Sequence, residues 1–207
     1  MPRIVALDLA LTKSGVGIVS RRADGSTFAS GAGIKHERPV GKAGRAKAGL
    51  PPTPTLIERR TAFVAAAREL HHYAAGAALV VVYDVPTGVK VSGAARVDIP
   101  AAWWAVVGPL VRAGVPVATV LDGSVRKAIT GKGTHGSREA NKVATALAVR
   151  SLYPDLDIES DDVADAVAAA HLGAVACGWD VPTLKRHHDV KWSEWPVLPD
   201  PSAVEVA

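Results

Sequence analysis

The chain has 207 residues, of which 48% are hydrophobic and 21% charged, with a formal net charge of +4. This balance excludes an intrinsically disordered chain and is sufficient for one ordinary domain with a sizeable core. The basic sequence pI, near 9.3, modestly favours a polyanionic partner but identifies none by itself.

Cys177 is the only cysteine, which excludes an internal disulfide and any zinc site built on cysteines. The N-terminal residues lack the charged-then-apolar layout of a signal peptide, and no apolar run is long enough to cross a bilayer. We therefore expect a soluble protein of a reducing compartment, cytoplasmic in a bacterium or viral within the cytoplasm of its host.

Apolar runs and turn residues divide the first part of the chain into strands and one helix. A meander of three strands is predicted at residues 3–10, 15–21 and 27–34. Residues 36–53 are rich in Gly, Pro, Lys and Arg, which predicts a loop. A helix is predicted over about 55–75, because apolar residues recur there near one helical face.

The rest of the chain alternates strands and helices. The predicted elements are a strand at 77–85, a helix at 97–113, a strand at 115–121, and helices at 137–152 and 161–177. A meander followed by βαβ units predicts an α/β fold with a mixed sheet and helices on both faces. We assign residues 1–178 to this domain. Residues 179–207 form a Pro- and Trp-containing tail, an extended arm unless Trp192 and Trp195 dock.

Four aspartates lie where an ionised side chain is costly without a partner. Asp8 lies within the first predicted strand, and Asp84 lies at the carboxyl end of the fourth. Asp162 and Asp165 lie three residues apart at the start of an apolar helix, so they share one face. Turn formation explains Asp8 or Asp84 singly, and capping explains Asp161 and one further acid. Neither explains the four together.

If the four carboxylates converge, they form a site of hard oxygen ligands. Such ligands suit Mg²⁺, with Mn²⁺ as a substitute. Two such ions roughly 4 Å apart activate a water and stabilise the leaving oxygen of a phosphodiester. Without metal, converging carboxylates repel and raise one another's pKa. The metal-site hypothesis therefore depends on convergence.

Four segments, in order, resemble the motifs of RuvC-like Holliday junction resolvases. They are "IVALDLALTKSGVGIV", "VVVYDVPTG", "VRKAITGKGTHGSREANKV" and "DDVADAVAAAHLGA". The resemblance covers about residues 1–178 and implies a ribonuclease H-like fold with a mixed five-stranded sheet. It also implies a homodimeric, Mg²⁺-dependent endonuclease that makes paired nicks in four-way DNA junctions. The catalytic metal ligands that it implies are Asp8, Asp84, Asp162 and Asp165.

Basic residues form two clusters that suit contacts with DNA phosphates. The first surrounds a Gly-rich segment and comprises Arg126, Lys127, Lys132, Arg138 and Lys142. The second comprises Lys35, Arg38, Lys42, Arg45 and Lys47, which either bind the same DNA or keep a loop soluble. Contacts of this kind position DNA without reading its sequence.

Some residues depart from the family pattern or have more than one interpretation. The second carboxylate of the family is usually Glu, whereas this chain has Asp84. Three residues later the family commonly has an aromatic side chain that opens the junction as a wedge, whereas this chain has Thr87. His171 lies six residues after Asp165, farther than the histidine that some relatives use, and we interpret it as structural. Trp103 and Trp104 diverge by about 100° on a helix, so one can face the core and the other a dimer partner.

Three alternatives to a junction endonuclease stay open. The first alternative is another ribonuclease H-like nuclease, although an exonuclease of the acidic type requires a second acid at the position of Ala10. An actin-like nucleotide-binding domain is the second, because "LDGSVRK" (121–127) weakly resembles the phosphate loop of such domains. A non-catalytic junction-binding relative is the third.

Overall fold

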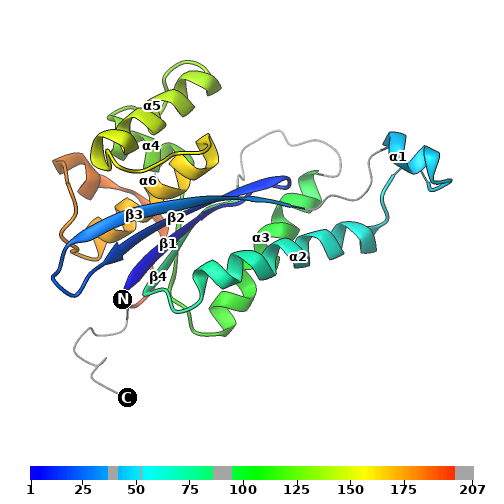
Figure 1. The fold of residues 1–207 in the computed structure, drawn as a ribbon, viewed down its shortest axis with the longest axis horizontal. Helices are drawn as coiled ribbons and strands as arrows, with labels where there is room; N and C mark the ends of the chain where they lie inside the picture. Colours follow the sequence, from blue (N-terminus) through cyan, green and yellow to red (C-terminus); the bar gives the residue numbers. More distant parts are fainter. Residues whose placement is uncertain (37–41, 52, 86–94, 199–207) are drawn as a thin grey trace.

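The structure is a computed structural model and describes residues 1–36, 42–51, 53–85 and 95–198. In this part of the chain, two layers of helices pack against a β-sheet (Figure 1). Within these residues, six strands form one sheet of order β3-β2-β1-β4-β5-β6. The strands are β1 (Arg3–Asp8), β2 (Lys13–Arg21), β3 (Thr27–Lys35), β4 (Leu79–Tyr83), β5 (Val117–Val120) and β6 (Trp192–Glu194). The central strand β1 is antiparallel to β2 and parallel to β4, which makes the sheet mixed.

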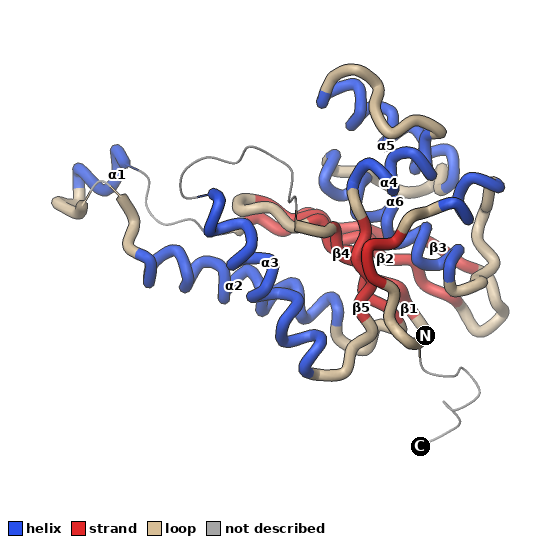
Figure 2. Tube along the Cα trace, turned by 180° about the vertical axis from the view of Figure 1, so that it is seen from behind, coloured by secondary structure: helices blue, strands red, loops and turns tan. Residues whose placement is uncertain are grey.

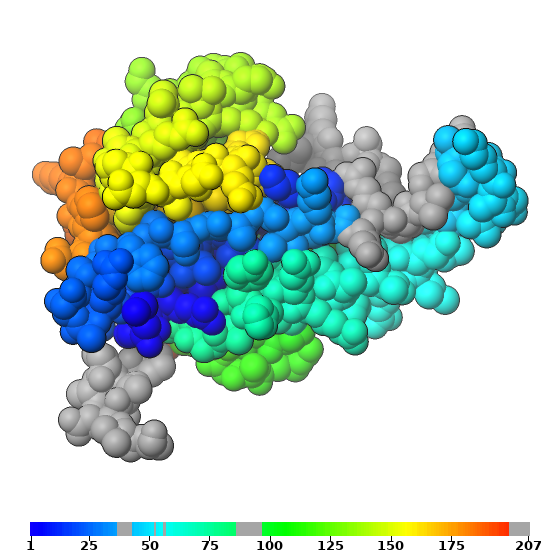
Figure 3. Space-filling model, viewed as in Figure 1, coloured from blue at the N-terminus to red at the C-terminus, as the bar shows by residue number. Residues whose placement is uncertain are grey.

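Helices cover both faces of the sheet, as Figures 1 and 2 show from opposite sides. One face carries α4 (Asp122–Thr130), α5 (Arg138–Leu152) and α6 (Asp161–Ala176), and the other carries α2 (Leu56–Ala74) and α3 (Ala95–Arg112). The short helix α1 (Lys42–Lys47) and the start of α2 project away from the sheet (Figure 3). None of the helices in the described ranges is both long and apolar enough to span a membrane.

Alternation along the central strands divides the core in two. Ile4 and Ala6 of β1 pack with α4, α5 and α6, whereas Val5 and Leu7 pack with α2 and α3. Because successive side chains of a strand point to opposite faces, Asp8 continues the series of Ile4 and Ala6. The sheet therefore directs Asp8 towards the layer that contains α6.

The predicted mixed α/β architecture is confirmed, with one more strand than the five expected. The predicted strands and helices are present with ends shifted by a few residues. Four elements were not predicted: α1, inside the expected loop; α4; the 3₁₀ helix η1 (Lys185–Asp189); and β6, which pairs with β5. Since Asp122–Lys127 lie in α4, the phosphate-loop interpretation of "LDGSVRK" is wrong.

The first two turns of α6 lie directly on the β1–β2 hairpin. A Cβ atom at Gly15 would overlap the carbonyl of Asp162, and one at Gly17 would overlap the backbone of Ala166. Gly15 and Gly17 are two residues apart, so they face the same side of β2. Their lack of side chains allows α6 to approach the sheet closely enough to bring its aspartates near Asp8.

We predict that Gly17→Ala destabilises the fold by about 2–3 kcal/mol or more, because overpacking against backbone cannot be relieved by a rotamer change. The melting temperature should fall by about 6 °C or more. Gly33→Ala is the matched control on β3, where the new Cβ would meet the Lys13 Cε, 2.6 Å away at the end of a flexible side chain. Equal melting temperatures for the two variants would contradict the close approach of α6.

Candidate active site

A pocket of about 660 Å³ opens beside the carboxyl ends of β1 and β4. Elements α3, α4, α5 and α6 contribute its walls. Among the described residues, its charged lining is Asp8, Asp84, Asp122, Asp162, Asp165, Arg126, Arg138 and Lys142. The four aspartates singled out from the sequence thus line one pocket, together with a fifth that the sequence did not indicate.

Parallel pairing of β1 with β4 places Asp8 and Asp84 at one edge of the sheet. The register pairs Leu7 with Val82, so Asp8 lies at the end of one strand and Asp84 just beyond the end of the other. The backbone N–H of Asp84 donates to the Val120 carbonyl at 2.9 Å, which keeps this residue in line with β5. Its carboxylate Oδ1 accepts the N–H of Val85 at 2.8 Å. That bond fixes one oxygen and leaves the other available to the pocket.

Ser160, and not Asp161 as expected, caps α6, since its hydroxyl accepts the N–H of Val163. Asp161 instead forms an ion pair with Lys142 of α5. The capping and pairing hold the helix start with Asp162 and Asp165 turned to the pocket.

Two aromatic residues brace the pocket from the sheet side. The Tyr83 hydroxyl donates to the backbone carbonyl of Asp165 at 2.8 Å, which ties the end of β4 to α6. The Trp103 indole N–H donates to the carbonyl of Tyr83 at 2.8 Å, which ties α3 to the same strand end. Tyr83 consequently braces the end of β4 against α6. Thr87 lies outside the described residues.

Burial and mutual repulsion perturb the carboxyl groups of the pocket. Burial, followed by repulsion from Asp165 and Asp162, raises the pKa of Asp8 from 3.8 to about 8. Burial, followed by repulsion from Asp122, raises the pKa of Asp165 to about 6. Lys142 opposes the shift at Asp8 without cancelling it. The pocket therefore favours an added positive charge, either protons or a cation.

The donor set of the pocket suits a hard divalent cation. Among the described residues that line it, the charged ligand candidates are carboxylate oxygens, and none of these lining residues is a cysteine or histidine. Within the described ranges, however, no three His, Cys, Asp or Glu side chains lie close enough to hold one ion as they stand. The chemistry fits Mg²⁺, and binding requires the carboxylates to rotate towards a common point.

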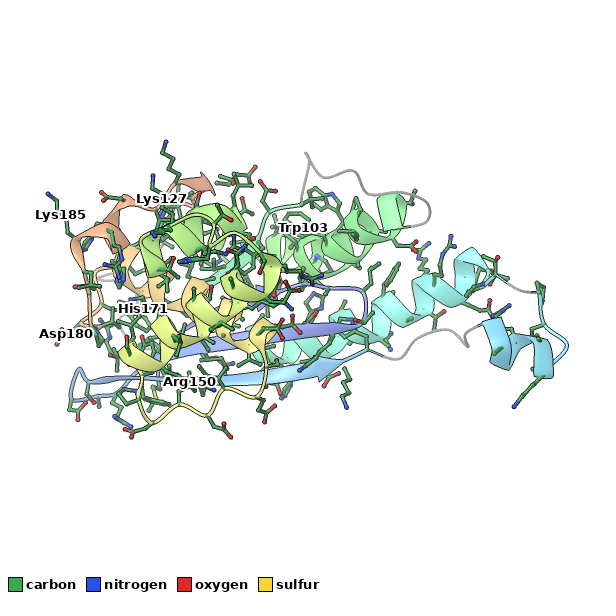
Figure 4. All side chains as sticks on the ribbon, turned by 90° about the horizontal axis from the view of Figure 1, so that it is seen from above. Trp103, Lys127, Arg150, His171, Asp180 and Lys185 are labelled. Carbon is green, nitrogen blue, oxygen red and sulfur yellow. The ribbon has the colours of Figure 1, made fainter. Side chains whose placement is uncertain are left out.

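The first basic cluster divides into residues inside and outside the pocket. Arg126, Arg138 and Lys142 line it, whereas Lys127 and Lys132 are exposed and are not among its lining residues. Figure 4 shows Lys127 extending outward from α4. The Arg126 guanidinium donates hydrogen bonds to the Asp122 carboxylate and to the Gly133 carbonyl.

The second basic cluster is not a uniform DNA-binding surface. Arg45 is 1% exposed, and its Nη1 lies 2.8 Å from the Oε1 of Glu58, so the interpretation of Arg45 as a DNA contact is wrong. The ion pair instead fastens α1 to the first turn of α2. Lys35 and Lys47 are exposed, whereas Arg38 and the side chain of Lys42 lie outside the described part of the chain.

His171 has the structural role expected of it. It is buried in α6 (Figure 4), with Nδ1 2.9 Å from the Tyr153 hydroxyl and Nε2 3.1 Å from Nδ1 of His187. Burial, followed by repulsion from His187, lowers the pKa of His171 to about 3, which keeps the ring neutral. This network joins α5, α6 and η1 outside the lining of the pocket.

Asp122 is the pocket residue that sequence reasoning missed. It directly follows Leu121, at the carboxyl end of β5, and begins α4. The position after a parallel strand singled out Asp84 and could have singled out Asp122 as well. The short helix that follows concealed it, because Gly123 interrupts a weak helical pattern.

We predict that Asp8→Asn stabilises the metal-free protein at high pH. A carboxyl whose pKa is higher in the folded chain contributes stability that is complete below about 3.8 and is lost as the pH rises to about 8. In EDTA, the variant should melt about 3 °C or more above the original protein at pH 8, and the difference should shrink towards pH 4. Asp157→Asn, at an exposed position, is the control. A lower melting temperature for Asp8→Asn at pH 8 would refute the electrostatic cost.

No protein-family model and no curated protein sequence matches this chain. Solved structures, however, match this chain. The structure of Thermus thermophilus RuvC matches with a TM-score of 0.56 and 24% identity over 87% of this chain and 99% of that one. The T. thermophilus RuvC in complex with a Holliday junction substrate matches with a TM-score of 0.58 and 22% identity, over 86% and 97%. At these identities the likeness concerns the fold, and this chain has the RuvC-like, ribonuclease H-like fold.

Proposed function

We propose that this protein is a structure-selective DNA endonuclease that resolves four-way or other branched junctions by metal-dependent phosphodiester hydrolysis. The observation that carries the proposal is the meeting of Asp8, Asp84, Asp162 and Asp165 in one pocket beside the cationic start of α5. The matched T. thermophilus protein, whose fold this chain shares, was solved with a Holliday junction substrate, which supports the same substrate class.

The residues divide into a metal-binding group and a phosphate-binding group. Asp8, Asp84, Asp162 and Asp165 would hold Mg²⁺, or Mn²⁺ in its place, which supplies water activation and charge stabilisation at the leaving oxygen. On α5, Arg138 and Lys142 lie one turn apart and face the same pocket, so they orient the phosphate to be cut.

Contacts outside the pocket position the DNA. Lys127 and Lys132 are exposed, follow Arg126 and precede Gly133 in the chain, and suit sequence-independent contacts with phosphates. Because such contacts carry no sequence information, preference for a junction arises from the shape of the DNA and from the spacing of two active sites.

A homodimer would supply the two active sites. Val97, Trp104 and Val111 lie seven residues apart on α3 and are 63%, 62% and 56% exposed. Residues seven apart lie near one helical face, so these three form an apolar stripe on α3, a helix of the sheet face that does not carry α4, α5 and α6. An exposed stripe of this kind suits an interface with a second copy.

We predict that a synthetic four-way junction with Mg²⁺ is nicked at paired positions, and that Asp165→Asn lowers the nicking rate at least about 100-fold without weakening junction binding. Denaturing gels of end-labelled junctions measure the rate, and electrophoretic mobility in EDTA measures binding. Asp155→Asn, an exposed acid before α6, is the control that should cut normally. Tight binding without cutting in Mg²⁺ or Mn²⁺ would instead establish a non-catalytic junction-binding protein.

The same assay tests the shorter carboxylate at position 84. We expect Asp84→Glu to lower the nicking rate. The Asp84 carboxylate accepts the Val85 N–H, and the Trp103–Tyr83 hydrogen bond fixes the adjoining strand end, so the pocket fits a side chain of the length of Asp. A higher rate in the Glu variant would show that the shorter side chain limits activity.

We predict that Trp104→Glu converts the dimer into a monomer, because a buried unpaired charge opposes association. Sedimentation velocity measures the change, and paired nicking should become uncoupled single nicking. Leu147→Glu, on α5 and 59% exposed, is the control, since it lies on the opposite side of the sheet. An unchanged sedimentation coefficient for Trp104→Glu would exclude the α3 interface.

A further inference from the structure

Asp122 and Arg126 form an ion pair on the wall of the pocket. They lie four residues apart on α4, and Arg126 Nη2 contacts both carboxylate oxygens of Asp122. The side chain of Arg126 is 13% exposed and that of Asp122 is 60% exposed. The arginine is thus held inside the pocket by an acid at its rim.

The remaining contacts of Arg126 leave it suited to a phosphate. Its Nη1 donates to the Gly133 carbonyl at 2.9 Å, which fixes the guanidinium against the Gly-rich segment. Its buried Nε has no hydrogen-bond partner among the residues described. Once Asp122 moves away, Nε and Nη2 form one free edge of the planar guanidinium, and this edge can bind two phosphate oxygens in bidentate form.

A helix pair at this spacing is often only a surface contact worth about 0.3–0.5 kcal/mol. Two observations distinguish this pair. Arg126 is mostly buried in the pocket and not spread over the surface. The Asp122 carboxylate also adds negative charge to a site that already contains four carboxylates. The Asp122 carboxylate therefore opposes the binding of a substrate phosphate unless the carboxylate moves away.

We propose that Asp122 is a built-in competitor for the substrate phosphate: it holds Arg126 in place in the free protein and yields Arg126 to a DNA phosphate that enters the pocket. The exchange deepens the proposed function and rests on it. DNA that contacts only the exposed Lys127 and Lys132 does not displace Asp122. Asp122 therefore lowers the affinity for DNA whose phosphate must enter the pocket and take Arg126, and it leaves contacts with Lys127 and Lys132 alone unaffected.

A double-mutant cycle of Asp122→Asn and Arg126→Gln tests the exchange. Affinities for a labelled four-way junction are measured in EDTA, so that cleavage and metal binding play no part. Asp122→Asn should tighten binding about 2- to 10-fold, the range expected for removing one competing carboxylate. Arg126→Gln should weaken binding, and the double variant should bind like Arg126→Gln alone.

The control is Glu139→Gln, which removes an exposed acid from the first turn of α5. Its effect on affinity should be the same with Arg126 or Gln at position 126, as for any general change of charge. If the gain from Asp122→Asn also persists in the Arg126→Gln background, the exchange is wrong and the effect is long-range repulsion. Weaker binding by Asp122→Asn would likewise overturn it.

Failure of the proposed function has a different signature. If the original protein does not bind the junction at all, the endonuclease proposal and the exchange both fail. If the original protein binds the junction but shows no coupling between positions 122 and 126, only the exchange fails. Thermal melting of each variant confirms that the fold is retained.

Discussion

The contact between α6 and the β1–β2 hairpin determines where the pocket lies. Gly15 and Gly17 allow the helix backbone to rest on the sheet, and the helix then carries Asp162 and Asp165 to the strand end that bears Asp8. Any side chain at these glycines would displace the helix by more than the tolerance of a metal site, whose ligand distances vary by only about 0.2 Å. The meeting of the four aspartates therefore depends on two glycines that take no part in the chemistry.

The pocket is electrostatically costly, and its surroundings hold it together. Burial and repulsion raise the pKa values of Asp8 and Asp165 because the carboxylates share a partly desolvated space. The Tyr83 and Trp103 hydrogen bonds tie β4, α6 and α3 together around that space, so the carboxylates cannot relax by moving their helices apart. A rigid frame around repelling groups is the arrangement expected of a site that binds a cation.

Part of this arrangement could be predicted from the sequence. The apolar runs of β1 and β4 predicted buried strands, with Asp8 inside the first and Asp84 at the carboxyl end of the second, and the fold places both at one edge of the sheet. Elements α4 and β6 could not be predicted, because a short helix with Gly123 and a three-residue strand depend on tertiary contacts more than on propensity. Arg45 was misassigned because its partner, Glu58, lies thirteen residues away and only the fold brings them together.

The missed helix α4 is the element that connects the tail to the pocket. Its start follows β5 directly, and β6 pairs with β5 at Val120, two residues before Asp122. At its other end, Arg186 of η1 donates to the carbonyls of Ala128 and Ile129 at 2.9 and 3.0 Å, which satisfies groups that a helix end leaves unpaired. Residues assigned to an extended arm thus brace both ends of α4. The position of Asp122 and Arg126 in the pocket wall consequently depends on a segment that contributes none of the pocket's charged residues.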